Sequence, residues 1–131
     1  MNKALILMRE AERDLGTGNY NKAVSASYFA VRMVAELLLR DLRTRKDDKI
    51  ANALGRVMGE DSRRELMYLF ERRKEADHRD RVFTREEAED VVSRARSLLE
   101  RILERIERDG SGSQGYGGGA RKSREGEGVR F

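Results

Sequence analysis

The residues best suited to chemistry are gathered in one charged stretch of the sequence. Glu71 to Arg81 contains five cations, four anions and the only histidine of the chain, His78. A histidine titrates near neutral pH and can exchange protons with a reacting group, and a nearby guanidinium can bind a phosphate and stabilise its developing charge. Together they are the minimum for cutting RNA without a metal ion. The 2′-hydroxyl of the substrate attacks, the protein moves protons, and arginine offsets the charge of the pentavalent phosphate.

The same stretch also has a purely structural interpretation. Arg73–Asp77 and Asp77–Arg81 are both spaced i,i+4, so they can form surface ion pairs worth a few tenths of a kcal/mol each. Moreover, 22 of the 28 cations are arginines, so an arginine shortly before the histidine carries little information. From these residues alone, a nuclease site and a solvated helix face both stay open.

Helix geometry limits which arginine can act together with His78. Five positions along a regular helix turn through about 500°, which leaves Arg73 and His78 roughly 140° apart around the axis. Either the helix bends near Asp77, or the two groups come from different subunits of a dimer. Lys74 shares the face of His78 better than Arg73 does. Arg72 also satisfies the loose spacing, so the choice of arginine stays open.

Composition excludes several classes of site in this chain of 131 residues. Without cysteine, and with one histidine, it has no disulfide scaffold, thiol nucleophile, cysteine metal site or multi-histidine metal cage. The pair Gly16 and Gly18 is followed by no phosphate-loop or dinucleotide signature. We therefore expect no metal and no cofactor. Apolar runs are only a few residues long, so we expect no membrane span or leader and a cytoplasmic location.

Apolar residues recur at helical spacing along most of the sequence, and no proline interrupts them. We expect a capping box at Ser62 with Glu65, and a second at Thr84 with Glu87. The pattern predicts an all-α fold, an antiparallel up-and-down bundle of four to five helices. The expected helices run over residues 2–15, 20–45, 48–58, from 61–62 into the charged stretch as far as 81, and from 84 onward.

Two further expectations concern the ends and faces of this bundle. Residues 1–109 form the predicted helical domain, whereas residues 110–131 contain 8 of the 12 glycines and are predicted to be a flexible, weakly basic, disordered tail. The apolar stripe of the second helix is wider than half its circumference. Because three neighbouring helices cannot cover so wide a face, we expect a homodimer.

The order of features along residues 3–106 resembles the HEPN family (higher eukaryotes and prokaryotes nucleotide-binding domain). Tyr28 lies in a segment similar to the family's second helix, Ser25-Ala-Ser-Tyr-Phe-Ala30. Arg73 and His78 are similar to the family's Arg followed by four to six residues and His. The segment Phe83-Thr-Arg-Glu-Glu-Ala88 is similar to the start of its last helix. The chain is thus expected to be a small stand-alone prokaryotic or archaeal member.

The resemblance implies a dimer in which both Arg-x4-His motifs face one cleft. In active relatives this cleft is a metal-independent endoribonuclease that leaves 2′,3′-cyclic phosphate ends, often the toxin of a toxin–antitoxin pair with a small nucleotidyltransferase. The resemblance implies that His78 is the general acid/base and that Arg73 holds the scissile phosphate. The remaining expected site residues are Arg72, Lys74 and Arg79 on RNA phosphates, with Asp77 and Tyr28 in support.

Two positions depart from the family pattern. Lys74 stands where active members commonly have a small polar residue, and Asp80 stands where some toxins have a tyrosine that the partner modifies with nucleotide. One alternative is therefore a non-catalytic module that binds a nucleotidyltransferase partner, nucleotide or RNA. Another is a nonspecific nucleic-acid binder that uses the arginines and the tail, which the small net charge of +4 disfavours.

Overall fold

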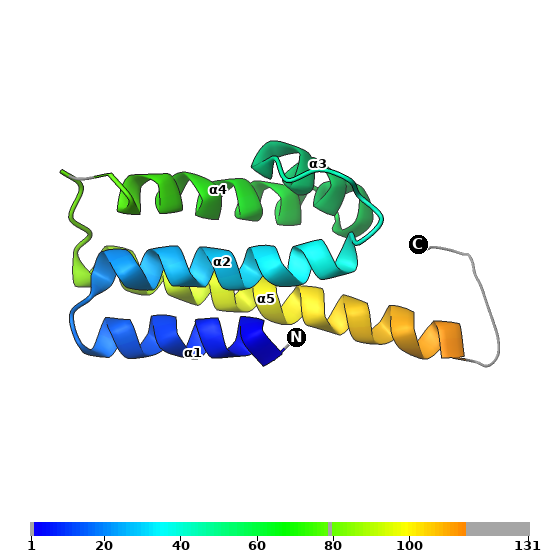
Figure 1. Ribbon diagram of the computed structural model, residues 1–131, viewed down its shortest axis with the longest axis horizontal. Helices are drawn as coiled ribbons and strands as arrows, with labels where there is room; N and C mark the ends of the chain where they lie inside the picture. The colour runs from blue at the N-terminus through cyan, green and yellow to red at the C-terminus, as the bar shows by residue number, and fades with distance from the viewer. Residues whose placement is uncertain (1, 79, 115–131) are drawn as a thin grey trace. The chain divides into compact units, whose positions relative to one another are not determined.

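The computed structural model describes residues 2–78 and 80–114, and these residues are helical with short connections. Contacts divide the chain into two compact units, residues 1–100 and 101–131. The described residues contain no strand, so the all-α prediction is confirmed (Figure 1). The helices are α1 (Asn2–Gly16), α2 (Tyr20–Leu38), α3 (Asp47–Met58), α4 (Glu60–Ala76) and α5 (Arg85–Gln114).

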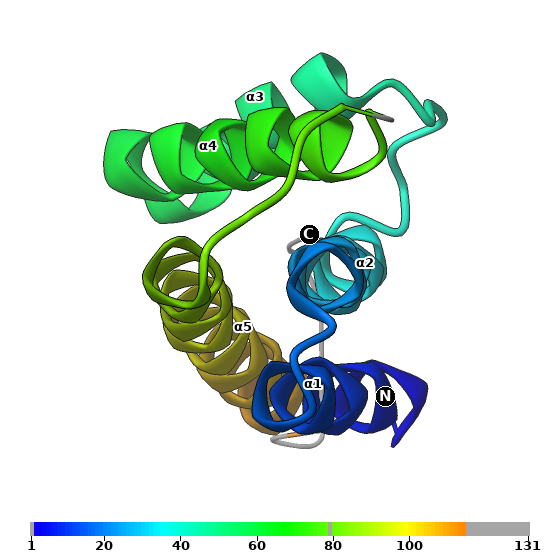
Figure 2. The ribbon, with the colours of Figure 1, turned by 90° about the vertical axis from the view of Figure 1, so that its left-hand side faces the viewer.

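Within residues 1–100, α2 lies between α1 and α4 and packs against both (Figures 1 and 2). It runs antiparallel to each of them, and α3 packs on α4. The first part of α5 is tied to α4 by a hydrogen bond from the Tyr68 hydroxyl to Asp90, 3.1 Å, and to α1 by the ion pair between Arg96 and Glu12. One side of α2 is left without a covering helix in this unit.

The core of this unit forms where apolar residues recur at three- and four-residue spacing. Met8 of α1, Val34 of α2, Leu54 of α3 and Leu69 of α4 are fully or almost fully buried, as is Leu98 of α5. The predicted stripe of α2 is therefore confirmed in its middle. At its end, however, Leu37 remains 38% exposed.

The prediction that the second helix continues to Arg45 is wrong, because α2 ends at Leu38. The amide of Leu42 instead donates to the carbonyl of Leu39, 2.8 Å, which forms a turn. Arg32 stabilises the loop that leads from α2 to α3 by donating to the Arg45 carbonyl at 2.6 Å and to Asp47 Oδ1 at 2.9 Å. These tertiary hydrogen bonds outweigh the local helix propensity of the segment.

The capping box predicted at Ser62 and Glu65 is wrong. Helix α4 begins earlier, at Glu60, after Gly59, whose φ of 107° suits only glycine. Ser62 is buried inside the first turn. Glu65 instead pairs with Arg94 of α5, with Oε1 2.7 Å from Nε and Oε2 3.0 Å from Nη2.

The capping box at the start of α5 is confirmed. The amide of Glu87 donates to Thr84 Oγ1 at 3.1 Å, and the amide of Thr84 donates to Glu87 Oε1 at 2.9 Å. At its other end α5 continues to Gln114, past Asp109, where the composition changes. Most of the predicted tail, residues 115–131, lies outside the described residues.

Candidate functional site

His78 lies just beyond the end of α4 and is exposed. The predicted continuation of this helix to Arg81 is wrong: α4 ends at Ala76, and Asp77 is its cap, with an amide that donates to the Arg73 carbonyl at 3.1 Å. The amide of His78 donates to the Glu75 carbonyl at 3.0 Å, and its own carbonyl accepts from Arg81 at 3.2 Å. The imidazole is therefore presented by a turn, and the angular separation expected on an unbroken helix does not apply.

Asn21, in the first turn of α2, holds this turn against the bundle. Its Nδ2 donates to the carbonyl of Ala76 at 3.0 Å and to that of Arg81 at 2.6 Å. Its Oδ1 accepts from the amide of Phe83 at 2.9 Å. One amide side chain thus satisfies three backbone groups on the two sides of His78. Sequence reasoning missed Asn21, because nothing local distinguishes it from the neighbouring exposed Asn19.

The side chain of Arg73 faces α2. Its Cζ lies 4.8 Å from the centre of the Phe29 ring, a cation–π contact, and its Nε lies 3.0 Å from Asp77 Oδ2. The side chain is 30% exposed. The guanidinium is thus held between an aromatic face and a carboxylate, with its Nε buried and the side chain as a whole partly exposed.

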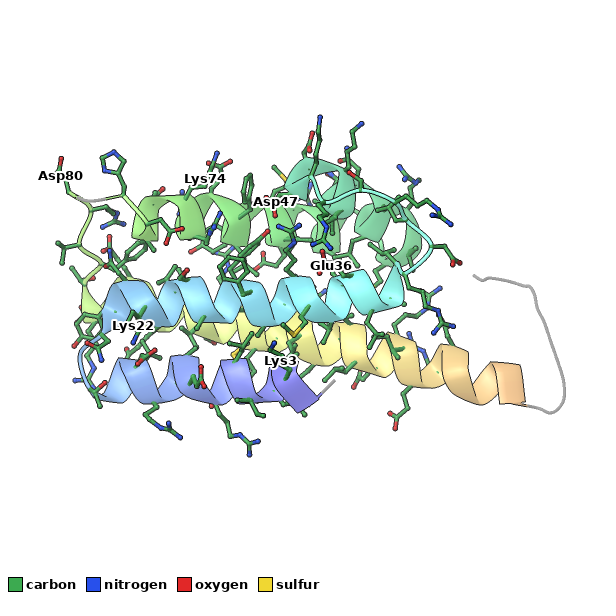
Figure 3. The ribbon with its side chains drawn as sticks, viewed as in Figure 1. Lys3, Lys22, Glu36, Asp47, Lys74 and Asp80 are labelled. Atoms are coloured by element: carbon green, nitrogen blue, oxygen red, sulfur yellow. The ribbon has the colours of Figure 1, made fainter. Side chains whose placement is uncertain are left out.

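A partly buried polar cluster formed by Tyr28, Arg32 and Asp47 joins α2 to the start of α3, where Figure 3 labels Asp47. The Tyr28 hydroxyl donates to Asp47 Oδ1, and Arg32 Nη1 donates to the same oxygen. Burial raises the pKa of Asp47 above its ordinary value, and the positive charges of Arg73 and Lys74 partly oppose that rise. Asp47 is therefore close enough to both cations to influence them.

Asp47 is not among the site residues predicted from the sequence. Its only local signal is its position as an acid in the first turn of a helix, which many structural acids share. Tyr28, which was predicted to support the site, is 1% exposed and packs edge-on against Phe29, with ring centres 5.3 Å apart. It therefore lies in the core and contacts Asp47, and its supporting role in the site stays a prediction.

Lys74 lies on the outer side of α4 (Figure 3). Its Nζ is 4.7 Å from the centre of the Phe70 ring and 3.4 Å from Glu71 Oε2, and the side chain is 51% exposed. The ring of Phe70 in turn lies 6.1 Å from that of Tyr28. Lys74 thus borders the same group of aromatic residues as Arg73 and remains accessible to solvent.

Arg72 points in a different direction from Arg73. Its Cζ lies 5.1 Å from the centre of the Tyr68 ring, over which Arg94 of α5 also lies. Its Nη2 pairs with Glu75. Glu75 also pairs with Arg81, at 3.2 Å, and Arg81 continues the network to Glu87 at the start of α5. Arg72 is therefore part of a structural ion-pair network that joins α4 to α5.

The structure thus brings some of the predicted site residues together and separates others. Arg73, Asp77 and the buried Tyr28 gather where α4 faces α2, and Lys74 borders them from the outer side of α4, whereas Arg72 belongs to the network with α5. In the described ranges, no hydrogen bond or ion pair links Arg73 to the exposed His78. Arg79 lies outside the described residues.

No group of three or more His, Asp or Glu residues in the described part of the chain is placed to hold a metal ion. Among the helices described, none is both long enough and apolar enough to cross a membrane. The side chains of this site offer an exposed imidazole that can carry protons and a partly shielded guanidinium that can bind phosphate oxygens.

The family model of the HEPN domain matches residues 1–106. The chain therefore belongs to the HEPN family, a family of nucleotide-binding and ribonuclease-type modules. No curated protein and no solved structure matches it. The match covers α1 to α4, the turn that carries His78 and α5 as far as residue 106, so the candidate site residues lie within the matched part of the chain.

Proposed function

We propose that this protein is a metal-independent endoribonuclease that acts as a homodimer. The observation that carries the proposal is the placement of Arg73 and His78. Arg73 is held by Phe29 and Asp77 with its side chain partly exposed, and His78 is presented in solvent by the turn that follows the same helix. Under this proposal the helices of the HEPN fold position the two side chains, His78 transfers protons and Arg73 binds the phosphate.

The reaction is transesterification of RNA. The 2′-oxygen attacks the neighbouring phosphorus as a base removes its proton, and the bond to the 5′-oxygen breaks as an acid protonates that oxygen. The products are a 2′,3′-cyclic phosphate and a free 5′-hydroxyl. One imidazole cannot give and take a proton at the same instant on opposite sides of the phosphorus. A dimer supplies two copies of His78 for the two roles, while Arg73 offsets the charge of the pentavalent phosphate.

The uncovered side of α2 is the surface proposed for dimerisation. Phe29 and Leu37 lie eight positions apart on α2 and are 37% and 38% exposed. Ile6 of α1 is 46% exposed. It lies one turn before Glu10, which lines the same hollow between α1 and α2 as Phe29. Pairing through this dimer face, formed by Ile6, Phe29 and Leu37, would cover apolar surface and bring the Arg73 side chains to the interface.

The family resemblance further supports a role as the toxin of a toxin–antitoxin pair whose partner is a small nucleotidyltransferase. Because Asp80 stands two residues after His78, a partner that modifies a tyrosine at that position has no acceptor there. The sequence therefore favours neutralisation by a partner that binds tightly over the turn with His78.

Cleavage of RNA in EDTA tests the proposal. We expect the purified protein to cut single-stranded RNA in EDTA and to leave 2′,3′-cyclic phosphate ends. His78→Ala should reduce the rate by about 10²-fold or more, the range typical of a lost general acid or base. Asp80→Ala, in the same exposed turn, is the matched control and should retain activity. Cleavage that persists fully in His78→Ala would overturn the assignment.

A non-catalytic binding module is the second candidate. It is favoured by the pairing of every cation in the last turns of α4 with an acid: Arg72 with Glu75, Arg73 with Asp77 and Lys74 with Glu71. This candidate predicts a stoichiometric complex with a nucleotidyltransferase that tolerates His78→Ala, and no nuclease activity above background.

A further inference from the structure

The connection between α2 and α3 forms a basic surface that plays no part in the site described above. Residues 39–46 contain four cations and a single acid, Asp41. They surround a hollow of about 500 Å³, a size typical of small-ligand sites. We name it the arginine hollow. Its lining residues are Glu36, Leu39, Arg40, Leu42, Arg43, Thr44, Arg45 and Ile50.

The arginines of this hollow differ from those of α4 and α5. Arg85, for example, pairs with Glu89 at 3.2 Å, and Arg96 pairs with both Glu12 and Glu100. By contrast, no ion pair is described for the guanidinium groups of Arg40, Arg43 and Arg45, all of which are exposed. The one acid in the lining, Glu36, already pairs with Arg32 at 3.3 Å. The rim of the hollow therefore carries positive charge that no described acid neutralises.

Hydrogen bonds hold the loop in place around the hollow. Arg32 donates to the carbonyl of Arg45 at 2.6 Å and so anchors one end of the loop to α2. The amide of Lys46 donates to Thr44 Oγ1 at 3.2 Å, and the amide of Leu42 donates to the Leu39 carbonyl at 2.8 Å. Because the backbone is already ordered, a ligand would bind with a smaller loss of conformational entropy than at an unstructured basic tail.

The chemistry of the lining indicates what the hollow binds. Guanidinium groups present paired donors that match phosphate oxygens, and their planar faces also stack on nucleobases. Leu39, Leu42 and Ile50 add apolar surface beneath them. A nucleotide combines a phosphate with a flat, largely apolar ring, whereas an acidic peptide offers the charge without the ring. A base can enter such a hollow only when it is unpaired, which favours a single strand over a duplex.

We propose that the arginine hollow is a docking site for single-stranded RNA, distinct from the site of cleavage. The inference rests on the proposed nuclease function. The hollow lies at the C-terminal end of α2, and the turn with His78 lies beside the N-terminal end of that helix, where Asn21 holds it (Figure 1). The two ends of this 19-residue helix are about 28 Å apart. An RNA that occupies both sites must therefore be several nucleotides long.

Binding of an uncleavable RNA tests the docking site. The probe is a fluorescent 12-nucleotide single strand with 2′-O-methyl riboses, which lacks the attacking hydroxyl and so reports binding whether or not the protein is a nuclease. We expect the triple variant R40Q/R43Q/R45Q to bind it about tenfold more weakly in 0.1 M salt. The slope of log Kd against log salt should fall by about two, since each phosphate contact to a single strand contributes roughly 0.7.

The control variant R9Q/R64Q/R85Q removes the same charge from three exposed arginines outside the hollow and should change the Kd less than threefold. Unchanged affinity in R40Q/R43Q/R45Q, or an equal loss in the control variant, would overturn the docking site. So would competition by polyglutamate at the same concentration of charge as RNA, because the hollow would then be selecting acidic protein. Thermal melting checks that both variants fold.

Cleavage kinetics separate this inference from the nuclease proposal. In R40Q/R43Q/R45Q we expect KM to rise for a 12-nucleotide substrate and kcat/KM to remain unchanged for a dinucleotide, which cannot reach the hollow. If the protein cleaves neither substrate, the nuclease proposal fails, while the binding measurement still decides whether the hollow holds RNA. An equal loss on both substrates would contradict a docking role.

Discussion

The hydroxyl of Tyr28 donates a hydrogen bond to Oδ1 of Asp47, which connects the middle of α2 to the first turn of α3. Arg32 donates to the same oxygen and also to the carbonyl of Arg45. Asp47 thus lies between the candidate site and the proposed docking site: the charge of Arg73 acts on it from α4, and the loop of the arginine hollow ends beside it. One partly buried carboxylate therefore connects the two regions.

Tyr28→Phe tests the importance of this connection with the smallest possible change. The ring keeps its packing against Phe29 and Phe70, and only the hydrogen bond to Asp47 is lost. We expect a loss of about 1 kcal/mol in the free energy of unfolding, which corresponds to a fall in Tm of roughly 4 °C. Tyr20→Phe, in the first turn of α2, is the control. Equal melting of wild type and Tyr28→Phe would contradict the role of the hydroxyl.

Asp47→Asn should change how stability depends on pH. Because burial raises the pKa of Asp47 in the folded protein, the folded state binds this proton more tightly than the unfolded state does. The stability that this carboxyl contributes is therefore greatest at low pH. It is lost as the pH rises from the pKa of Asp47 in the unfolded chain to its raised pKa in the folded protein. An asparagine side chain does not ionise, so the variant does not lose this stability as the pH rises. The Tm of Asp47→Asn minus that of wild type should therefore increase from pH 3 to pH 7. A constant difference would be inconsistent with this assignment.

Arg73→Gln and Arg72→Gln should have different effects. Arg73 has a partly exposed side chain over Phe29, and we expect its loss to slow RNA cleavage by about 10²-fold without unfolding the protein. Arg72 belongs to the network with Glu75 and Arg81, so its loss should cost about 1 kcal/mol of stability and leave cleavage within a few-fold of wild type. Initial rates and urea denaturation measure the two effects. The reverse pattern would assign the phosphate to Arg72.

Asn21→Leu should disturb the turn with His78 from a distance. It leaves the carbonyls of Ala76 and Arg81 and the amide of Phe83 without their partner, at a cost of about 2 to 3 kcal/mol. Cleavage should also fall, because the imidazole loses its fixed position. Asn19→Leu, at an exposed neighbouring position, should do neither. Proteolysis within residues 77–82 that is faster in Asn21→Leu would report the loosened turn directly.

A charge on the dimer face should produce monomers. Ile6 and Leu37 are exposed in the single chain, so Ile6→Glu and Leu37→Glu need not disturb its core. We expect light scattering to give a dimer mass for wild type and a monomer mass for the double variant, together with a loss of cleavage. Val82→Glu is the matched control, since Val82 is 78% exposed and lies outside that face. A dimer that persists in the double variant would place the interface elsewhere.

Much of the fold follows from local features of the sequence. Glycines and capping residues set most helix ends, as Gly59 and the pair of Thr84 with Glu87 show, and helical periodicity identified the buried stripes. The errors fall where distant residues determine the structure. Nothing near Leu38 indicates that α2 ends there and that Arg32 donates a hydrogen bond to the carbonyl of Arg45 in the following loop. Likewise, Glu65 has the spacing of a capping residue but finds Arg94 on another helix.

The residue types of the candidate site come from the sequence and stay a prediction, whereas the geometry around them could not be predicted locally. The spacing of Arg73 and His78 suggested a problem of angular separation on one helix. The structure removes that problem by ending α4 at Ala76, which depends on hydrogen bonds from Asn21, more than fifty positions away in sequence. The difference between Arg72 and Arg73 depends in the same way on aromatic partners from separate elements, Tyr68 and Phe29.

Asn21 donates hydrogen bonds to the carbonyls of Ala76 and Arg81. The turn with His78 is therefore an arc of the chain that is fixed at both of its ends. A residue inserted after Asp77 would enlarge the arc and leave the packing register of α4 and α5 unchanged. Of the four residues between Arg73 and His78, only Asp77 lies outside α4, so the position of His78 depends on this arc as well as on the helix. Such an insertion would move the imidazole relative to Arg73 while the two flanking helices keep their places.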